Sequence, residues 1–304
     1  MPTLNILMAT RNGSRFIGAQ LDSLLDQTHA DWQLWVSDDG SQDETCARVR
    51  AFGAAHPGRL RRLRPGPGQG SAANFLSLLA DPALAGTWVA FCDQDDVWMA
   101  HKLTRAVAQI TAADRPSIYA SRTVLTDACL RTQRLSARQS KPLEFGNALV
   151  QNVLAGNTIV MPPAVTDVMR GSLDAARRAQ VPFHDWWMYL MATGAGMGVI
   201  YDDTPGAFYR QHAGNLMGDA ALRRLDRLRA VADGRYAQWM ARNTAALCEV
   251  QDLLTPASAA QLSQLTSWRS APRWTRGRPQ TLGLYRQTLA GNAALAFLAR
   301  SQRI

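Results

Sequence analysis

Blocks of apolar residues alternate with polar and turn-forming residues through the first 115 positions of the chain. Each compact apolar run is followed by a stretch whose apolar residues recur at helical spacing, such as Ile17, Leu21 and Leu24. We expect Ser14 to cap the first of these helices. Four repeats of strand and helix predict an α/β fold with a mostly parallel sheet covered by helices. The expected strands are 4–9, 32–36, 60–63 and 87–92, and the expected helices follow Ser14, cover 43–54 and surround 75–79.

The pattern is looser in the remainder of the chain, where strands are short and helical spacing then takes over. No internal repeat or low-complexity segment interrupts it. We place the domain boundary near 214–218, which gives a main domain at 1–215 and a mainly helical extension at 216–304. The further expected strands are 117–120, 158–161 and 199–201, the segment 181–192 is expected to begin as a turn and become a helix, and the helical extension is expected to break near Pro256 and at 270–279.

Composition describes a folded protein with enough apolar material for a core: 47% of the 304 residues are hydrophobic and 19% are charged. No run approaches the ~18 apolar residues that a membrane-spanning helix needs. The amino terminus lacks the basic region of a signal peptide. The four cysteines are scattered, so we expect free thiols and a cytoplasmic location.

The net charge of +9 is concentrated in the last third of the chain, where 13 arginines face 5 acidic residues from Asn215 onward. Two basic, amphipathic segments, 222–229 and 268–278, suggest contact with an anionic membrane surface. A solvated helical cap or a dimer surface is the alternative. A nucleic-acid partner is not expected, because the surplus is confined to one region and no nucleic-acid-binding motif is present.

The most informative polar cluster is Asp93-Gln94-Asp95-Asp96, which directly follows the fourth expected strand. Three carboxylates in four positions repel one another and are costly to bury without a cation. Oxygen ligands suit Mg²⁺ or Mn²⁺, and ligands bind at the carboxyl edge of an open α/β sheet. A solvated acidic turn is the alternative, but the preceding apolar strand and the following Trp98 argue against it.

Three further clusters carry chemistry. Thr10-Arg11-Asn12 follows the first strand, and Asp38-Asp39 follows the second, where a carboxylate can accept from the imide N–H of uracil or thymine or simply form a capped turn. His184-Asp185 is flanked by Trp186 and Trp187, and an aspartate in apolar surroundings gains a raised pKa that suits a general base. Asp185 could instead serve as a helix N-cap. Arg210 and His212 add a cation for phosphate and an imidazole for metal.

Residues 3–100 and 150–215 together resemble the family 2 glycosyltransferases with the GT-A fold, and most closely the rhamnosyltransferase-like branch. Several collinear motifs carry this resemblance, which extends over about two thirds of the chain. The matching segments are Ile6–Gly13, Gln20–Thr28, Val36–Asp43, Gly70–Phe75, Phe91–Trp98, His184–Trp187 and Tyr209–His212. The resemblance implies a Rossmann-like nucleotide-binding half and a catalytic domain at 1–215.

The resemblance also implies roles for individual residues. Asp95 would be the direct metal ligand, helped by Asp93 and His212, and Asp185 would be the catalytic base. Asp96 would face the sugar or order its loop. The implied donor contacts are Thr10, Arg11, Asn12, Asp38, Asp39, Asn74, Asp93, Asp96 and Arg210, and the implied sugar and acceptor pocket is His184, Trp186, Trp187 and Trp98. Arg11 stands where the family often has a tyrosine, so the details of base recognition differ here.

The predicted reaction is an inverting transfer of a sugar from a nucleoside diphosphate to a hydroxyl of a cell-surface glycan precursor. The family likeness favours dTDP-L-rhamnose as donor, with a UDP-hexose second, and a glycan or lipid-linked saccharide as acceptor. A cytoplasmic enzyme at the inner face of the membrane would fit this reaction. A nucleotidyl or phosphoryl transferase is the competing reading, but the chain has no G-x-x-x-x-G-K-[ST] loop and only two lysines.

Overall fold

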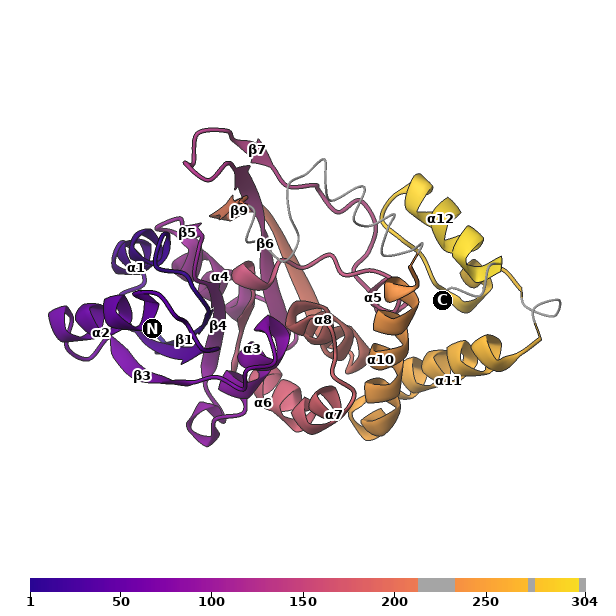
Figure 1. Ribbon diagram of the computed structural model, residues 1–304. Coiled ribbons are helices and arrows are strands. Elements are labelled where there is room, and N and C mark those ends of the chain that lie inside the picture. The colour runs from indigo at the N-terminus through magenta and orange to yellow at the C-terminus, as the bar shows by residue number, and fades with distance from the viewer. Residues whose placement is uncertain (213–232, 273–276, 301–304) are drawn as a thin grey trace.

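The computed structural model describes residues 1–212, 233–272 and 277–300, and shows a sheet with helices on both faces (Figure 1). The strands are β1 Leu4–Thr10, β2 Trp32–Asp38, β3 Leu60–Pro65, β4 Trp88–Asp93, β5 Val97–Trp98, β6 Ser117–Thr126, β7 Arg134–Leu135, β8 Val160–Met161 and β9 Gly198–Arg210. The α-helices are α1 Ile17–Leu25, α2 Thr45–Ala55, α3 Ser71–Leu79, α4 Lys102–Thr111, α5 Phe145–Ala148, α6 Pro163–Gly171, α7 Leu173–Arg178, α8 His184–Gly194, α10 Arg235–Glu249, α11 Pro256–Ser270 and α12 Leu289–Arg300. Short 3₁₀ turns are η1 Pro82–Leu84, η2 Gly156–Thr158, η3 Gln251–Leu253 and η5 Pro279–Leu282.

The sheet is mixed and mostly parallel, with the order β3-β2-β1-β4-β8-β6-β9-β5 and β7 paired to β6. The long ladders β1–β2, β1–β4, β2–β3 and β6–β9 are parallel, whereas the antiparallel pairings that involve β5, β7 and β8 are short. The predicted α/β fold is therefore confirmed. All four strands expected in the first 115 residues form. The parallel pairings β1–β2, β1–β4 and β2–β3 bring the carboxyl ends of these four strands to one edge of the sheet.

Two hydrophobic clusters cover the two faces of this sheet, as expected when parallel strands are buried on both sides. Along β4, Val89 and Phe91 pack with α3 and α8 on one face, and Ala90 and Cys92 pack with α1, α2 and α4 on the other. The apolar run in the sequence thus reads as a doubly buried strand. The same alternation places Asp93 at the end of β4, beyond both clusters.

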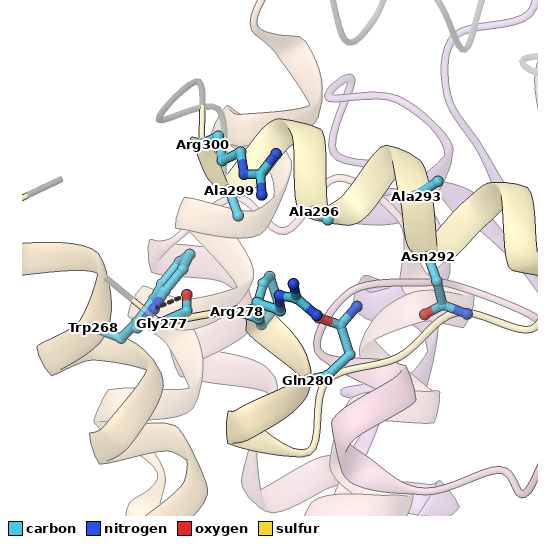
Figure 2. Close-up of a pocket in the computed structure, with 10 residues that line it drawn as sticks. Trp268, Gly277, Arg278, Gln280, Asn292, Ala293, Ala296, Ala299 and Arg300 are labelled. Carbon is cyan, nitrogen blue, oxygen red and sulfur yellow. Dashed lines mark hydrogen bonds between the residues drawn. The ribbon is translucent and has the colours of Figure 1, made fainter. Parts of the chain in front are cut away.

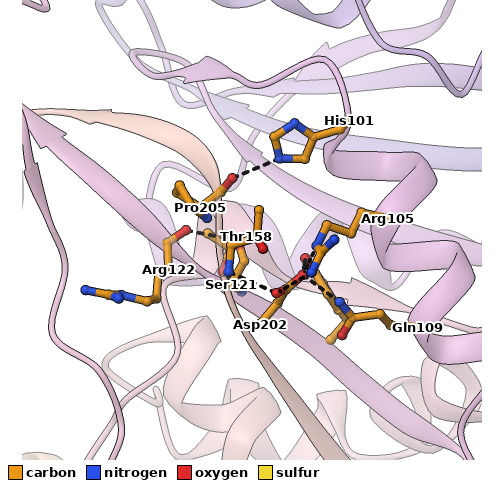
Figure 3. A network of polar contacts seen from close by, with 10 residues as sticks. His101, Arg105, Gln109, Ser121, Arg122, Thr158, Asp202 and Pro205 are labelled. Carbon is orange, nitrogen blue, oxygen red and sulfur yellow. Dashed lines mark hydrogen bonds and ion pairs between the residues drawn. The ribbon is translucent and has the colours of Figure 1, made fainter.

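A buried carboxylate ties β9 to the neighbouring elements α4 and β6 (Figure 3). Asp202 accepts hydrogen bonds from the Arg105 guanidinium, from Gln109 Nε2 at 2.6 Å and from the Tyr119 hydroxyl at 2.9 Å. The chain then bends, and His101 Nε2 lies 3.1 Å from the carbonyl oxygen of Pro205. This network fixes the middle of β9, whose last residues reach the acidic cluster.

Helices α10 and α11 pack onto the main domain through the same cluster that contains α8, and they include Met240, Leu247, Leu262 and Leu265. Figure 1 shows α10, α11 and α12 at the end of the molecule opposite β1, β2 and β3. The expected domain boundary near 214–218 and the basic segment 222–229 lie outside the described residues. No helix in the described parts of the chain has the length and apolarity needed to cross a membrane.

Three sequence predictions about local structure are corrected. Ser14 does not cap α1: the residue before the helix is Phe16, and α1 begins without a side-chain cap hydrogen bond. The Ser14 N–H donates to Asp43 Oδ2 at 3.0 Å. The short strand expected at 199–201 is the start of the much longer β9. Trp268 is buried at the end of α11, where its indole N–H donates to the Gly277 carbonyl at 3.1 Å, so it does not belong to an exposed amphipathic face.

Candidate active site

The parallel register brings the polar residues after β1, β2 and β4 to one edge of the sheet. Thr10 pairs with Asp38 across β1 and β2, and Ala9 pairs with Asp93 across β1 and β4. Residues that are distant in sequence thereby become neighbours because the carboxyl ends of parallel strands coincide. This edge carries most of the residues that the sequence singled out.

Asp38 organises the loops after β1 and β2. Its carboxylate accepts hydrogen bonds from the Ser41 N–H at 2.8 Å, the Ser41 hydroxyl at 2.6 Å and the Thr10 hydroxyl at 2.7 Å. Burial opposes the charge, but these bonds outweigh it and lower the pKa of Asp38. Thr10 is itself buried, so its side chain supports Asp38, and the structure does not present it to a ligand.

Asp39 holds the glycine-rich loop between β3 and α3. Its two oxygens accept from the N–H groups of Gly68 at 2.6 Å and Gly70 at 2.8 Å. Both glycines have positive φ angles, which favour glycine. A Cβ at Gly66 would lie 2.6 Å from Asp39 Oδ1 and 2.7 Å from Asn74 Oδ1, so any other residue would force these side chains to move. Asn74 Nδ2 donates to the Ser37 carbonyl at 2.9 Å and fixes α3 beneath this loop.

A cavity of about 390 Å³ opens between the ends of β2 and β3. Asp39 forms part of its wall, and Arg50 and Arg64 provide positive charge beside it. A planar ring with a hydrogen-bond donor next to an anionic group would match this lining. Neither Arg50 nor Arg64 was predicted from the sequence. The signal available for Arg64 is its place near the carboxyl end of the third expected strand, where ligand contacts gather.

Arg11 and Asn12 form the rim of this edge. The Arg11 N–H and carbonyl both pair with the side-chain amide of Gln94, at 3.0 and 2.9 Å, which joins the loop after β1 to the acidic loop. Asn12 has a φ of 47° and bridges to the next loop: its N–H donates to Ser41 Oγ and its side-chain oxygen accepts from the Gln42 N–H, both at 2.8 Å. The Arg11 side chain is exposed.

The acidic cluster after β4 is electrostatically strained. Burial raises the pKa of Asp93 to about 8, and the negative charges of Asp95 and Asp185 contribute to the rise. Asp95 Oδ2 lies 2.8 Å from His212 Nε2, which follows β9. The structure therefore places the residues expected to bind metal and the expected base in one electrostatic neighbourhood.

Asp96 orders the loop, and it does not reach the surface. It is fully buried, its Oδ1 accepts from the Arg210 N–H at 3.0 Å, and Asn157 Nδ2 donates to its Oδ2. The Arg210 guanidinium donates to the carbonyls of Asp95 at 2.8 Å and Ala128 at 2.6 Å. Of the two roles expected for Asp96, ordering its loop agrees with these contacts, whereas contact with the sugar does not, because the side chain is fully buried. The expected donor contact of Arg210 is not seen either, since its guanidinium holds backbone carbonyls. The role of Asn157 was not predicted from the sequence.

Asp95 and His212 fit a divalent cation as a partial ligand set. Among the described residues, no three His, Cys, Asp or Glu side chains converge in an arrangement that could hold a metal alone. Mg²⁺ and Mn²⁺ commonly take one or two protein ligands and complete their coordination with substrate phosphates. A carboxylate oxygen beside an imidazole, next to the unfavourably buried Asp93, meets that requirement.

Asp185 lies in the first turn of α8, where its Oδ1 accepts from the Trp186 N–H at 2.7 Å. Burial raises its pKa to about 6, although hydrogen bonds, including one from Asn152, oppose the rise. A carboxylate with this pKa is ionised at neutral pH and is a stronger base than an ordinary aspartate. His184 stacks on Phe75, with ring centroids 4.1 Å apart, and burial lowers its pKa to about 3.

The three tryptophans expected in a sugar pocket are core residues. Trp186 and Trp187 are buried, and their indole N–H groups donate to the Ala148 carbonyl and to Ser172 Oγ. Trp98 is also buried, and Lys102 Nζ lies 3.0 Å from the centroid of its ring. His184 is neutral and enclosed by phenylalanines, so none of these four side chains lines an open pocket. We correct that prediction.

Comparison with known proteins agrees with this geometry. The model of "Glycosyl transferase family 2" matches residues 5–164, more than half of the chain. The dTDP-rhamnosyl transferase RfbG of Shigella flexneri is 26% identical over 215 residues, which cover 69% of this chain and 73% of RfbG. WfgD of Escherichia coli, a UDP-Glc:alpha-D-GlcNAc-diphosphoundecaprenol beta-1,3-glucosyltransferase, is 33% identical over 107 residues, which cover 35% of this chain and 40% of WfgD.

Solved structures show the same fold. TarS 1–349 of S. aureus in complex with UDP-GlcNAc aligns with a TM-score of 0.57 at 15% identity, covering 99% of this chain and 88% of that chain. The mannosyltransferase PcManGT of Pyrobaculum calidifontis, solved with GDP-Man and Mn²⁺, aligns with a TM-score of 0.50 at 14% identity, covering 99% of this chain and 87% of that chain. The chain thus belongs to glycosyltransferase family 2, and it is a GT-A-fold enzyme that uses a nucleotide-sugar donor.

Proposed function

We propose that this enzyme catalyses an inverting, single-displacement transfer of a sugar to a glycan hydroxyl, with Asp185 as the general base. The observation that carries the proposal is the placement of Asp185 in the first turn of α8. Burial there raises the pKa of its carboxylate to about 6, and its charge raises the pKa of Asp93 at the end of β4. An acceptor hydroxyl must lose its proton as its oxygen attacks the anomeric carbon. A base with this pKa is ready to accept that proton at neutral pH.

The donor would lie along the sheet edge, with its base in the cavity beside Asp39 and its diphosphate near Asp95. Asp39 is held by two loop N–H groups, so its carboxylate is oriented before any nucleotide arrives. Asp95 and His212 would hold a divalent cation, Mn²⁺ or Mg²⁺. Such an ion supplies Lewis-acid stabilisation to the departing diphosphate. Asp96, Arg210 and Asn157 keep the Asp95 backbone in place during this step.

For the donor sugar we propose L-rhamnose from dTDP-L-rhamnose, supported by the match to RfbG over more than two thirds of both chains. A UDP-hexose is the second candidate, supported by the match to WfgD. A lipid-linked saccharide is the proposed acceptor, in line with the printed substrate of WfgD. The reaction would then take place on the cytoplasmic side of the membrane, with 1–215 as the catalytic domain.

A thermal-shift screen tests the donor assignment. The protein is heated with dTDP, UDP or GDP, each with and without Mn²⁺, because a ligand that binds only the native state raises its melting temperature. We expect dTDP with Mn²⁺ to give the largest shift, and Asp39→Asn to reduce it. A larger shift with UDP selects the UDP-hexose alternative, and a shift with GDP alone contradicts both. NMR of the glycosidic product then reports whether the anomeric configuration is inverted.

A further inference from the structure

Helix α12 exposes an apolar stripe that the fold of one chain does not bury. Leu289 is 85% exposed and Phe297 is 65% exposed, although the opposite side of the helix buries Leu295 and Leu298. The described residues contain five exposed large hydrophobic side chains, and two of them lie on this helix of 12 residues. Such clustering distinguishes α12 from a surface on which single apolar residues are scattered.

The stripe follows the helical repeat. Leu289, Ala293 and Phe297 are spaced at i, i+4 and i+8, so they lie on one face, and Ala293 between the two large side chains is exposed as well. Leu295 and Leu298 anchor the other face to the core cluster that contains Leu262 and Leu265. The helix is therefore held in place by one apolar side while it presents another to the surroundings.

The chain around α12 is exclusively cationic. Residues 253–304 contain seven arginines and no aspartate, glutamate or lysine. Two of these arginines, Arg278 and Arg300, line a cavity of about 590 Å³ between α11, η5 and α12. Figure 2 shows their side chains on either side of this space, with Trp268 at one end and Asn292 of α12 at the other. Both arginines are exposed.

We propose that α12 docks this enzyme onto an anionic phospholipid bilayer. Leu289 and Phe297 would enter the interfacial region, while Arg278 and Arg300 would contact headgroup phosphates at the mouth of the cavity. The charge favours this occupant. A second copy of the chain would bring the same positive field and repel the first, and a nucleic acid would leave two large apolar side chains without contact. An apolar stripe bordered by arginines matches a membrane interface on both counts.

The location of α12 is compatible with catalysis at the membrane. It lies at the end of the molecule opposite β1, β2 and β3, so docking would leave the cavity beside Asp39 uncovered (Figure 1). The surface is centred on α12, which lies outside the two basic segments singled out in the sequence, 222–229 and 268–278, and it shares Arg278 with the second of them. Of these two, only part of the second is described, and its Trp268 is buried. Docking concerns where the enzyme works, and it stands apart from the identity of donor and base.

Vesicle co-sedimentation of the full chain tests this surface. Vesicles of phosphatidylcholine alone are compared with vesicles that also contain phosphatidylglycerol, at low and high salt. We expect binding only to the anionic vesicles and a loss of binding in high salt. The double variant Leu289→Ser/Phe297→Ser should weaken binding on the order of tenfold, and Arg278→Gln/Arg300→Gln should do the same, since each group supplies part of the interfacial attraction.

Matched controls separate this surface from general effects. Leu135→Ser removes another exposed apolar side chain, 46% exposed on β7, and Arg131→Gln removes another exposed arginine. Both controls should bind vesicles like the unchanged protein, and all variants should keep its melting temperature and its donor hydrolysis. The proposal is overturned if the protein ignores anionic vesicles, if the controls lose binding equally, or if sedimentation velocity shows that the α12 variants abolish a dimer in solution. Donor hydrolysis by the same samples reports separately on the proposed function.

Discussion

The acidic residues at the end of β2 and those at the end of β4 lie on either side of β1, at the same edge of the sheet. Their surroundings nevertheless shift the pKa values of Asp38 and Asp93 in opposite directions. Asp38 accepts three hydrogen bonds from Ser41 and Thr10, which overcome the effect of burial and lower its pKa. Asp93 is raised to a pKa of about 8 by burial together with the charges of Asp95 and Asp185. Hydrogen bonds from its own loops stabilise the charge of Asp38, whereas burial and neighbouring charges destabilise the charge of Asp93.

The difference shows how to separate structural carboxylates from those that await a ligand. Both clusters look alike in the sequence, since each is a group of aspartates at the end of an apolar strand, two in the first and three in the second. Donors from the protein complete the first cluster, which can therefore shape a cavity without metal. In the second cluster, burial and the charges of Asp95 and Asp185 raise the pKa of Asp93, so positive charge from a bound cation would stabilise its ionised form.

The largest expected effect belongs to Asp185→Asn. Because the amide cannot accept the acceptor's proton, turnover should fall on the order of 10²-fold or more, while binding of the nucleoside diphosphate is retained. Steady-state kinetics of product formation and a thermal shift with nucleotide measure the two parts. Asp203→Asn, which removes an exposed carboxylate paired with Arg138, is the control and should be fully active. Unchanged turnover in Asp185→Asn would place the base elsewhere.

A pair of charge-removing variants compares the two clusters directly. Asp38→Asn weakens charge-assisted hydrogen bonds and should lower the free energy of unfolding by roughly 1.5 to 3 kcal/mol. Asp93→Asn removes a carboxyl group whose ionisation the metal-free fold opposes, so it should leave that free energy unchanged or raise it, while it reduces the Mn²⁺-dependent thermal shift. Urea denaturation without metal gives both values. If Asp93→Asn destabilises the metal-free protein as much as Asp38→Asn does, the contrast between the clusters is wrong.

Sequence patterns were sufficient for the strands and the positions of the acidic clusters. An apolar run such as that of β4 can only be a doubly buried strand when helices flank it, and the residue after it must then lie at the sheet edge. The pairing of Asp95 with His212 also agrees with the sequence motifs. These features depend on local spacing, which a sequence displays directly.

Other features depend on contacts between distant segments, and the sequence could not supply them. Asp96 accepts hydrogen bonds from Asn157, 61 positions away, and from the backbone N–H of Arg210. A residue that could have contacted the donor is therefore a buried structural residue. Trp186 and Trp187 follow Asp185, and aromatic residues there suit either a sugar pocket or a core. Only the packing of α8 decides between the two. The contact between Lys102 and the ring of Trp98 was not predicted for the same reason. Lysine occurs at only two positions in this arginine-rich chain, but its rarity does not show which ring it contacts.

A smaller effect is expected from Gly66→Ala on the nucleotide side of the comparison. The added methyl group would lie 2.6 Å from Asp39 Oδ1, so the carboxylate must move away from its place beside the cavity. Loss of about one charged hydrogen bond to the nucleotide predicts an affinity reduced about tenfold. Calorimetric titration with the preferred nucleoside diphosphate measures it. Gly18→Ala on α1 is the matched control, because a Cβ there meets no atom within 4 Å and binding should not change.

The smallest effect near neutral pH concerns the protonation of Asp185 itself. Burial raises its pKa to about 6, and the base works only when ionised, so kcat/KM should be half-maximal near pH 6 and fall about tenfold for each further pH unit below it. Asp38, whose pKa is lowered, stays ionised throughout this range and should contribute no inflection. Initial rates from pH 5 to 8 at saturating Mn²⁺ test this, with circular dichroism at each pH to exclude unfolding. A kcat/KM that stays constant down to pH 5 would contradict this and would mean that Asp185 is as accessible to water as an ordinary carboxylate. Asp38 near the nucleotide cavity and Asp185 near the reacting atoms would then no longer differ in pKa as their surroundings predict.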